Sequence, residues 1–387
     1  MARRARGAGE RVSAITSTAD VAARLADARA RRTPLRIAGA GTWLDAGRPC
    51  GPAERVNLDA LRGIVEYEPG DLTLTARAGT SLAEIERVTA GHGQWLPLDA
   101  FGDVGGTLGA TVATASSGPL ATAFGTPRNQ VLGCEVVTGA GEVIRVGGRV
   151  VKNVAGFDVT RLMTGAWGTL GVITEVSVRL RAKPAVDETI AVPLPPDGAA
   201  HAQRWLRASP LPAMAAELVS PALAKRLGIA APNAPVLLLR FGGNETFVRA
   251  ARHAVTALGD SRPAPATVWS ALRGVDGGGT CTFRLSGAPA RLAELWTATT
   301  RVIQDAGALA HATVSRGVIR CVLPAMPDDA LRTLLGALPP ATRIMERAPA
   351  SCWDPQPADR ATASLADGVR RVFDPDGLLN PGILGIT

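Results

Sequence analysis

The chain has 387 residues, enough for two or three domains with a large core, and although 46% of them are apolar, no run reaches the ~18 to 20 apolar residues of a membrane span. The net charge of +8 would suit nucleic acid, but the basic residues are scattered and almost all arginine, and aromatic residues make up only 4%, which argues against a nucleic-acid-binding protein. The five cysteines form no CxxC pair and the four histidines no HExxH or HxH motif, so no metal or iron–sulfur site is expected.

The basic start of the chain, residues 1–7, leads into no apolar segment, so we expect neither secretory nor twin-arginine export and place the protein in the cytoplasm.

A helix is predicted over residues 18–32, with Ser17 or Thr18 as its cap and arginines in its last turn. A short strand over residues 35–37 follows.

This strand ends in Gly39-Ala40-Gly41-Thr42, whose successive backbone N–H groups can form an anion-binding nest. The Rossmann fingerprint would need a third glycine where Leu44 stands and a long helix directly after it. A phosphate bound at this loop therefore indicates a different fold.

Strands and helices alternate over residues 55–98. Strands are predicted over 64–68 and 72–78, and a helix over 81–90 that begins with a capping box of Ser81 and Glu84.

Residues 105–119 carry almost no large side chains, so their own burial contributes little stability. Tight packing against a neighbouring strand and close approach of a cofactor explain this composition equally well. A hairpin of two strands, over 131–138 and 143–146, comes next, with a Gly-rich turn between them.

Residues 152–184 contain three glycines directly before an alternating apolar run, 172–180, which predicts a turn entering a strand. Taken alone, this is a tight turn before a core strand. Together with the small-residue segments at 38–43 and 105–119, residues 164–173 would converge on a long ligand with a pyrophosphate at its centre.

The middle of the chain repeats a strand followed by a helix, which predicts an antiparallel sheet with helices on one face. Proline-rich stretches mark its edges. The strands are expected at 236–241, 281–285 and 318–323, and the helices at 245–258, 289–306 and 328–338.

Four segments in chain order resemble the vanillyl-alcohol oxidase, or PCMH-type, FAD-binding proteins: Arg36–Thr42, Gly106–Ala113, Lys152–Thr174 and Phe373–Gly382. Within that superfamily the chain is most similar to the FAD-binding E subunits of bacterial glycolate oxidase. The resemblance implies an α+β fold, with a PCMH-type FAD-binding domain of two subdomains and a smaller cap domain with an antiparallel sheet and helices. The implied boundaries are 1–184 for the FAD-binding domain, 185–350 for the cap domain and 351–387 for a C-terminal segment that returns to the first domain.

The resemblance also implies FAD, with its pyrophosphate on the 39–42 loop and on backbone near residues 107–110. Covalent relatives carry a histidine in the first loop, which here holds Ala40, Gly41 and Thr42, so noncovalent FAD is expected. No catalytic residue is identified. The implied cofactor-binding residues are Gly39, Ala40, Gly41, Thr42, Trp43, Thr107, Leu108, Gly109, Ala110, Val112, Ala113, Gly118, Gly168, Thr169, Val172, Ile173 and Asn380.

One departure bears on catalysis. Relatives that oxidise D-2-hydroxy acids carry a His-x-Gly-Asp-Gly-Asn-x-His-like metal motif, whereas the sequence around His311 has neither a carboxylate nor a second histidine. Arg316 and Arg320 could pair a substrate carboxylate, but isolated arginines on a strand are more often solvated.

The resemblance therefore implies an FAD-binding subunit of a glycolate oxidase/dehydrogenase complex that oxidises glycolate, a small 2-hydroxy acid, to glyoxylate. Its partners would be a catalytic FAD-containing D-type subunit and an iron–sulfur F-type subunit, through which it would reach the inner membrane. Two alternatives stay open: a stand-alone FAD-dependent 2-hydroxy acid oxidoreductase, and a non-catalytic assembly subunit whose FAD site is weakened by the bulky Trp43 and Trp167.

Overall fold

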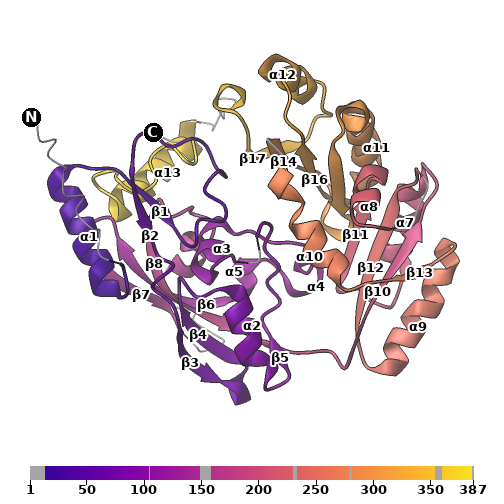
Figure 1. Ribbon diagram of the computed structural model, residues 1–387, viewed down its shortest axis with the longest axis horizontal. Helices are drawn as coiled ribbons and strands as arrows, with labels where there is room; N and C mark the ends of the chain where they lie inside the picture. Colours follow the sequence, from indigo (N-terminus) through magenta and orange to yellow (C-terminus); the bar gives the residue numbers. More distant parts are fainter. Residues whose placement is uncertain are drawn as a thin grey trace, which may run out of the picture.

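The computed structural model describes residues 14–103, 105–148, 158–229, 233–278, 281–353 and 360–385. They form two lobes that lie side by side, each built around an antiparallel sheet with helices packed on it (Figure 1). The predicted α+β class is confirmed. Residues 152–157, which the sequence places in one of the family-like motifs, lie outside the described residues.

The first lobe begins with α1 (Thr18–Arg31), capped by Ser17 as predicted, and a parallel pair, β1 (Leu35–Ala38) with β2 (Glu54–Asn57). Its main sheet has the order β3-β4-β8-β6-β7. The strands are β3 (Ile64–Glu68), β4 (Thr73–Arg77), β8 (Gly171–Arg179), β6 (Val131–Thr138) and β7 (Val143–Gly147). The alternating apolar run predicted as a strand is thus β8, at the centre of this sheet.

Short elements complete this lobe. In α2 (Leu82–Ala90), the Ser81 half of the predicted capping box forms, because Ser81 Oγ accepts from the Glu84 N–H at 3.1 Å. The others are η1 (Pro69–Asp71), β5 (Gln94–Trp95), paired with β9 (Arg181–Ala182), α4 (Ala121–Phe124), α5 (Pro127–Gln130) and α6 (Val159–Met163).

The small-residue segment forms α3 (Leu108–Thr114), which packs directly on a neighbouring strand. A Cβ atom on Gly109 would lie 2.5 Å from Ala78 Cβ, so only glycine allows this approach. Other residues of α3 line a cavity described below. Tight packing on the neighbouring strand is thus observed, and contact with a cofactor stays a prediction.

The second lobe is an eight-stranded antiparallel sheet in the order β13-β10-β12-β11-β15-β16-β14-β17. Helices cover both of its faces, so the prediction of helices on one face is wrong. The reason lies in β12, where Leu237 and Leu239 face one apolar cluster while Val236 and Leu238 face the other. An unbroken apolar run of this kind is buried on both sides.

The strands of this lobe are β10 (Val186–Pro193), β11 (Ala215–Val219), β12 (Val236–Gly243), β13 (Arg262–Ala264), β14 (Cys281–Ser286), β15 (Leu309–Thr313), β16 (Val318–Leu323) and β17 (Thr342–Arg347). One face packs on α7 (Gly198–Ala208), α9 (Glu245–Val255), α11 (Leu292–Ile303) and α12 (Asp328–Gly336). The other packs on α8 (Pro221–Arg226) and α10 (Thr267–Arg273), which is followed by η3 (Val275–Gly278).

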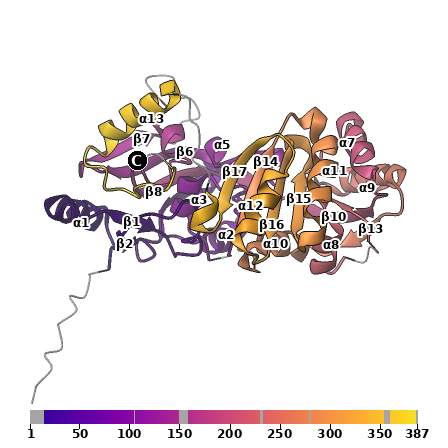
Figure 2. The same ribbon diagram turned by 90° about the horizontal axis from the view of Figure 1, so that it is seen from above.

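The C-terminal part of the described chain lies against the first lobe. Figure 2 shows α13 (Arg360–Phe373) over its sheet, where Val369 and Phe373 contact the apolar cluster of that sheet. Beyond α13, Leu379 forms a parallel bridge with Leu35 of β1. Among the described residues, no helix has the length and apolar character needed to span a bilayer.

Candidate functional site

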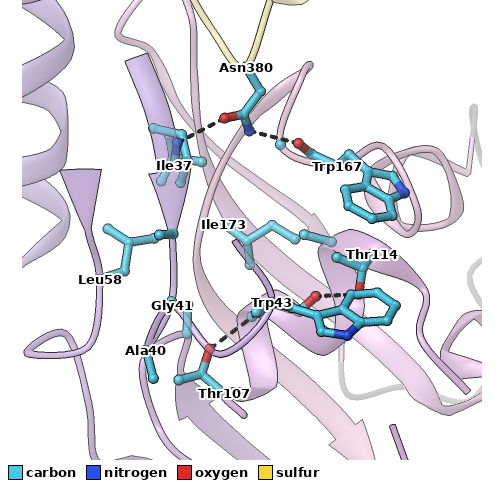
Figure 3. Close-up of a pocket in the computed structure, with 18 of the residues that line it drawn as sticks. Ile37, Ala40, Gly41, Trp43, Leu58, Thr107, Thr114, Trp167, Ile173 and Asn380 are labelled. Carbon is cyan, nitrogen blue, oxygen red and sulfur yellow. Dashed lines mark hydrogen bonds between the residues drawn. The ribbon is translucent and has the colours of Figure 1, made fainter. Parts of the chain in front are cut away.

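A cavity of about 750 Å³, including open solvent, lies in the first lobe between the loop after β1, one face of α3 and the turn before β8 (Figure 3). All three small-residue segments predicted to converge contribute to it. The predicted residues that line it are Gly39, Ala40, Gly41, Thr42, Trp43, Thr107, Gly109, Ala110, Ala113, Gly168, Val172, Ile173 and Asn380.

Four predicted site residues lie elsewhere. Leu108 and Val112 point into the apolar core under α3, because the helix periodicity places them on the face opposite the cavity. Thr169 turns its hydroxyl back to donate to the Ala166 carbonyl at 2.7 Å. Gly118 donates its N–H to Asp99 Oδ1 at 3.1 Å and does not line this cavity.

The loop over residues 39–48, called here the 39–48 loop, places backbone N–H groups beside the cavity. Within the described residues, the N–H groups of Gly39, Ala40, Gly41 and Thr42 donate no hydrogen bond. Gly41 has a φ of +77°, which side chains rarely adopt, and this turns successive N–H groups toward one side. Four unpartnered donors beside an open cavity fit a pyrophosphate.

Most backbone donors at the start of α3 have acceptors within the protein. The Leu108 and Gly109 N–H groups donate to the Thr80 and Ala78 carbonyls, both at 2.8 Å. The Ala110 N–H donates to Thr107 Oγ1 at 3.4 Å. That backbone near residues 107–110 binds the pyrophosphate stays a prediction.

Asn380 joins three parts of the cavity wall. Its Oδ1 accepts from the Ile37 N–H at 2.8 Å, and its Nδ2 donates to the Trp167 carbonyl at 2.7 Å (Figure 3). Its own N–H donates to the Leu35 carbonyl at 2.8 Å. Both ends of the carboxamide are thus occupied by protein, and Asn380 shapes the cavity instead of offering it a polar group.

Several lining residues are missed by the sequence reasoning. Arg36 donates from Nη2 to the Leu44 and Ala46 carbonyls, both at 3.3 Å, and so fixes the 39–48 loop. Nothing local indicates this role, since it depends on how the loop folds back. Trp167, noted from the sequence only as an obstruction, stands between glycines that could have identified it as a wall. The others are Ile37, Ala38, Leu44, Leu58, Ala78, Thr114 and Gly171.

Two indole rings stand at one side of the cavity. The Trp43 and Trp167 ring centroids are 5.9 Å apart and their planes are 17° from parallel. Trp43 is also fixed from the second lobe, because the Arg347 guanidinium lies over its ring at 5.3 Å and Arg347 Nε contacts Asp45 Oδ2 at 2.8 Å. Both rings are half-buried.

A second cavity, about 1,500 Å³ including open solvent, lies between the lobes. It shares Thr42, Trp43, Thr107, Ala110 and Thr114 with the first cavity, so the two are adjacent. The second lobe contributes Arg240, Trp269 and Arg273 to its wall, and the first contributes Asp99, Phe101 and Ser116.

Asp99 is a buried carboxyl in this interlobe wall. Burial raises its pKa to about 7, although the Leu120 N–H and the charge of Arg273 act in the opposite direction. Its oxygens accept from the N–H groups of Gly118 and Leu120, at 3.1 and 2.9 Å. Asp99 therefore changes charge close to neutral pH, beside the space that the two lobes share.

The expectation that Arg320 is solvated or free to pair a substrate is wrong. Its side chain is only 1% exposed, and it contacts Asp276 Oδ2 at 2.6 Å and Glu346 Oε2 at 2.7 Å. Arg316 is half-buried, and burial lowers its pKa.

His311 has the carboxylate neighbour that its local sequence lacks. Its Nδ1 lies 2.6 Å from Glu217 Oε2, across the adjoining strand β11. Both side chains are buried. Across the described ranges, no group of three or more His, Cys, Asp or Glu side chains is placed to hold a metal ion.

Comparison with known proteins adds the following. Residues 10–147 match a protein family described as the FAD binding domain. The sequence is 42% identical to glycolate oxidase subunit GlcE of Escherichia coli (strain K12) over 155 residues, 40% of this chain and 44% of that protein. It is 34% identical to glycolate oxidase subunit GlcD of Bacillus subtilis (strain 168) over 160 residues, 41% of this chain and 34% of that protein. The chain thus aligns with less than half of the length of these relatives.

Solved structures extend the likeness to nearly the whole chain. p-Cresol methylhydroxylase superposes with a TM-score of 0.74 at 15% identity, covering 96% of this chain and 88% of that one. Alkyldihydroxyacetonephosphate synthase gives a TM-score of 0.69 at 16% identity, covering 95% and 76%. At these identities the likeness shows the fold, and the predicted resemblance to PCMH-type FAD-binding proteins is confirmed.

Proposed function

Since residues 10–147 match an FAD binding domain and the chain has the fold of p-cresol methylhydroxylase, we propose that this protein is the FAD-binding subunit of a glycolate oxidase/dehydrogenase complex. The complex would oxidise glycolate to glyoxylate. The observation that carries the proposal is the 39–48 loop, where four backbone N–H groups that donate no hydrogen bond among the described residues lie beside an open cavity. The identity to two glycolate oxidase subunits supports the choice of complex.

The chain's own residues would bind and orient the cofactor. The N–H groups of residues 39–42 hold the pyrophosphate, while Ala110, Ala113 and Ile173 enclose it with apolar surface that excludes water. When bound, FAD would supply a redox group that can accept and release electrons. The first loop carries no histidine, so the bound FAD is proposed to be noncovalent.

The flavin content of the purified chain tests the proposal directly. We expect the visible spectrum of a bound flavin, and we expect acid precipitation to leave that flavin in the supernatant, because no covalent bond holds it. A correctly folded chain that shows no flavin, even after FAD is added, would contradict the proposal.

A substitution in the 39–48 loop provides the first mutational test. Gly41→Val should reduce FAD binding at least tenfold, because a side chain at a φ of +77° forces the loop to move and misaligns its N–H groups. Gly141→Val is the matched control, since Gly141 has a φ of +86° with no atom near its Cβ position and lies outside the cavity. If the two variants bound FAD with equal affinity, the proposal that the 39–48 loop binds FAD would be contradicted.

The partners of the complex are proposed from the relatives and from the chain's own site. Because no catalytic base or metal ligand is identified in this chain, substrate oxidation is assigned to a catalytic D-type subunit, with electrons passing to an iron–sulfur F-type subunit. Co-purification of tagged chain from its native host checks this, with subunit identities read by mass spectrometry. Recovery of a chain alone, with full glycolate-oxidising activity, would contradict the assignment.

A second candidate is a stand-alone FAD-dependent 2-hydroxy acid oxidoreductase. One observation favours it: the interlobe cavity adjoins the cavity beside the 39–48 loop and carries Arg273, which could meet a small carboxylate. Arg240 in the same wall is already paired with Asp187. Anaerobic addition of glycolate or lactate to the isolated, flavin-loaded chain separates the two candidates. Bleaching of the flavin absorbance would favour the stand-alone enzyme, and an unchanged spectrum the subunit.

A further inference from the structure

The guanidinium group of Arg55 lies against the 39–48 loop. Arg55 is on β2, which pairs in parallel with β1, the strand that ends in this loop. A Cβ atom on Gly41 would lie 2.4 Å from Arg55 Nη2. The guanidinium therefore contacts the loop at the residue whose φ of +77° turns the backbone N–H groups toward one side.

This contact is at the rim of the cavity. Leu44 Cδ1 would lie 3.3 Å from the same Cβ position on Gly41, and both Leu44 and Gly41 line the cavity (Figure 3). Leu58, three positions after Arg55 in the chain, lines it as well. Because Arg55 itself is exposed, a ligand that enters from solvent can reach its guanidinium.

The Arg55 side chain is held at one point and has donors to spare. Its Nε donates to Asn57 Oδ1 at 2.6 Å, and Asn57 stands on the same face of β2. In the part of the chain that the structure describes, Nη1 and Nη2 of Arg55 donate to no acceptor. An exposed arginine alone is a solvated charge, but this one is fixed beside backbone donors that also have no acceptor.

No acidic side chain among the described residues forms an ion pair with Arg55. Its neighbour Glu54 points to the opposite face of β2 and pairs with Arg31 at 2.9 Å. Asp45 of the 39–48 loop pairs with Arg347 at 2.8 Å. The rim of the cavity thus carries a positive charge that the protein does not neutralise.

Arg36 and Arg55 have different tasks at the loop. They are register partners in the β1–β2 pair, so both side chains leave the strands on the same face. Arg36 donates from Nη2 to the Leu44 and Ala46 carbonyls, which fixes the loop from within. The Nη atoms of Arg55 make no such contact, and they are left for a ligand.

We propose that Arg55 binds the pyrophosphate of FAD together with the N–H groups of residues 39–42, and that Asn57 positions its guanidinium. This inference rests on the proposed function. The N–H groups are neutral donors that satisfy phosphate oxygens, whereas the guanidinium adds a full charge and a fork of donors that matches two of those oxygens. Arg55 therefore favours a diphosphate ligand over an uncharged one.

Titration of the full chain with three probes tests this assignment. Arg55→Gln should raise the dissociation constants of FAD and of ADP about tenfold, the factor expected for one lost charge-assisted hydrogen bond. The affinity for riboflavin, which has no phosphate, should not change. The difference in FAD affinity between the native chain and Arg55→Gln should also shrink when the salt concentration rises from about 0.05 to 0.5 M, because salt screens an exposed charge.

A matched control removes an equal charge elsewhere. Arg62→Gln changes an exposed arginine of the same lobe that does not line the cavity, and it should leave the FAD dissociation constant unchanged. Arg55→Lys keeps the charge without the fork and should fall between the native chain and Arg55→Gln. The thermal unfolding midpoint of each flavin-free variant reports folding separately from binding.

The role of Asn57 is tested by a double-mutant cycle. Asn57→Ala should raise the FAD dissociation constant about threefold, because the guanidinium loses its anchor. Combined with Arg55→Gln it should add nothing further, since Asn57 acts only through Arg55. Fully additive effects would overturn the positioning role.

Arg55→Gln that binds FAD as tightly as the native chain, or no more weakly than Arg62→Gln, would overturn the assignment of Arg55. An equal loss of riboflavin affinity would overturn the contact with the pyrophosphate. In both cases the native chain still binds FAD and the proposed function stands. A native chain that binds no FAD overturns both.

Discussion

Asn380 and Trp167 are the two cavity residues other than glycine whose backbone is left-handed among those described, with φ of +44° and +53°. They contact each other through the Asn380 Nδ2 and the Trp167 carbonyl. Asparagine tolerates this conformation better than other residues, whereas tryptophan is strained in it. The hydrogen bonds of Asn380 thus help to hold Trp167 in a position that its own backbone preference does not favour.

Replacing Asn380 should therefore destabilise the first lobe. Asn380→Ala leaves the buried Ile37 N–H and Trp167 carbonyl without partners and should lower the free energy of unfolding by about 2–4 kcal/mol, measured by urea denaturation. Asn233→Ala is the matched control, because Asn233 is exposed and also left-handed, with a φ of +47°. Equal losses in the two variants would attribute the effect to the backbone alone.

Asp99 makes stability depend on pH near neutrality. Its pKa is about 7 in the folded chain against 3.8 for the unperturbed group, so the native state binds more protons between those values. Its contribution to stability is full below about pH 4 and is lost as the pH rises through 7. Relative to Asp99→Asn, the native chain should therefore lose free energy of unfolding from pH 5 to about pH 8 and then level off. Parallel curves for the two proteins would contradict this.

Secondary-structure elements with a strong local pattern are predictable from the sequence. Helix α1 and the strands β3, β6 and β8 have the expected places because their apolar residues repeat with the period of a helix or a strand. β2, which was not predicted, is four residues, Glu-Arg-Val-Asn, with one buried side chain. Its existence depends on pairing with β1, which no local pattern reveals.

The candidate site also has a part that the sequence predicts and a part that it does not. Its glycine-rich loops have a local signature, and most of the residues predicted from them line the cavity. The contacts that shape the cavity join distant residues: Asn380 to Ile37 across 343 positions, and Asn380 to Trp167 across 213. Such contacts follow from the tertiary arrangement, so composition and spacing along the chain do not contain them.

Element η3 carries a buried carboxylate that links β16 and β17. Asp276 Oδ2 accepts from Arg320 Nη2 at 2.6 Å and from Arg347 Nη1 at 2.9 Å, and all three side chains are at most 8% exposed. The two arginines then reach the first lobe, since Arg320 lies over the Phe101 ring at 4.1 Å and Arg347 over the Trp43 ring at 5.3 Å. Asp276 thus supports both interlobe contacts from one point.

Removing the Asp276 carboxylate should lower the free energy of unfolding. Asp276→Ala leaves buried guanidinium charge incompletely paired and should lower the free energy of unfolding by about 3–5 kcal/mol in chemical denaturation. Asp260→Ala breaks a well-exposed pair with Arg262 and serves as the control, for which no measurable change is expected. A loss below 1 kcal/mol for the buried position would contradict the role given to Asp276.

At the scale of the whole molecule, the cofactor cavity depends on both lobes. The first lobe supplies nearly all of its lining, yet the 39–48 loop is tied to β17 of the second lobe by the Gly47 N–H to the Glu346 carbonyl and by Asp45 to Arg347. The relative position of the lobes therefore sets the position of the loop. An isolated FAD binding domain would lack this support.

Weakening the contact between Asp45 and Arg347 should reduce the affinity for FAD with little change in the fold. Asp45 is 68% exposed, so Asp45→Asn should leave stability nearly unchanged while raising the FAD dissociation constant about threefold, measured by flavin fluorescence titration. Asp329→Asn, which removes an exposed partner of Arg332 on α12, is the matched control. If the control raised the FAD dissociation constant by the same factor, the effect would come from the change in net charge and not from the contact between Asp45 and Arg347.

The bridge between Leu35 and Leu379, and the Asn380 hydrogen bond beside it, can form only late in the synthesis of the chain. β1 emerges early from the ribosome, but the residues that hold its far end follow more than 340 positions later. Translation at ~5–20 residues per second separates the two by tens of seconds. During that interval the nascent chain carries β1 without the Leu379 bridge and without the Asn380 hydrogen bond to Ile37, so this edge of the cavity is completed only when residue 380 has been made.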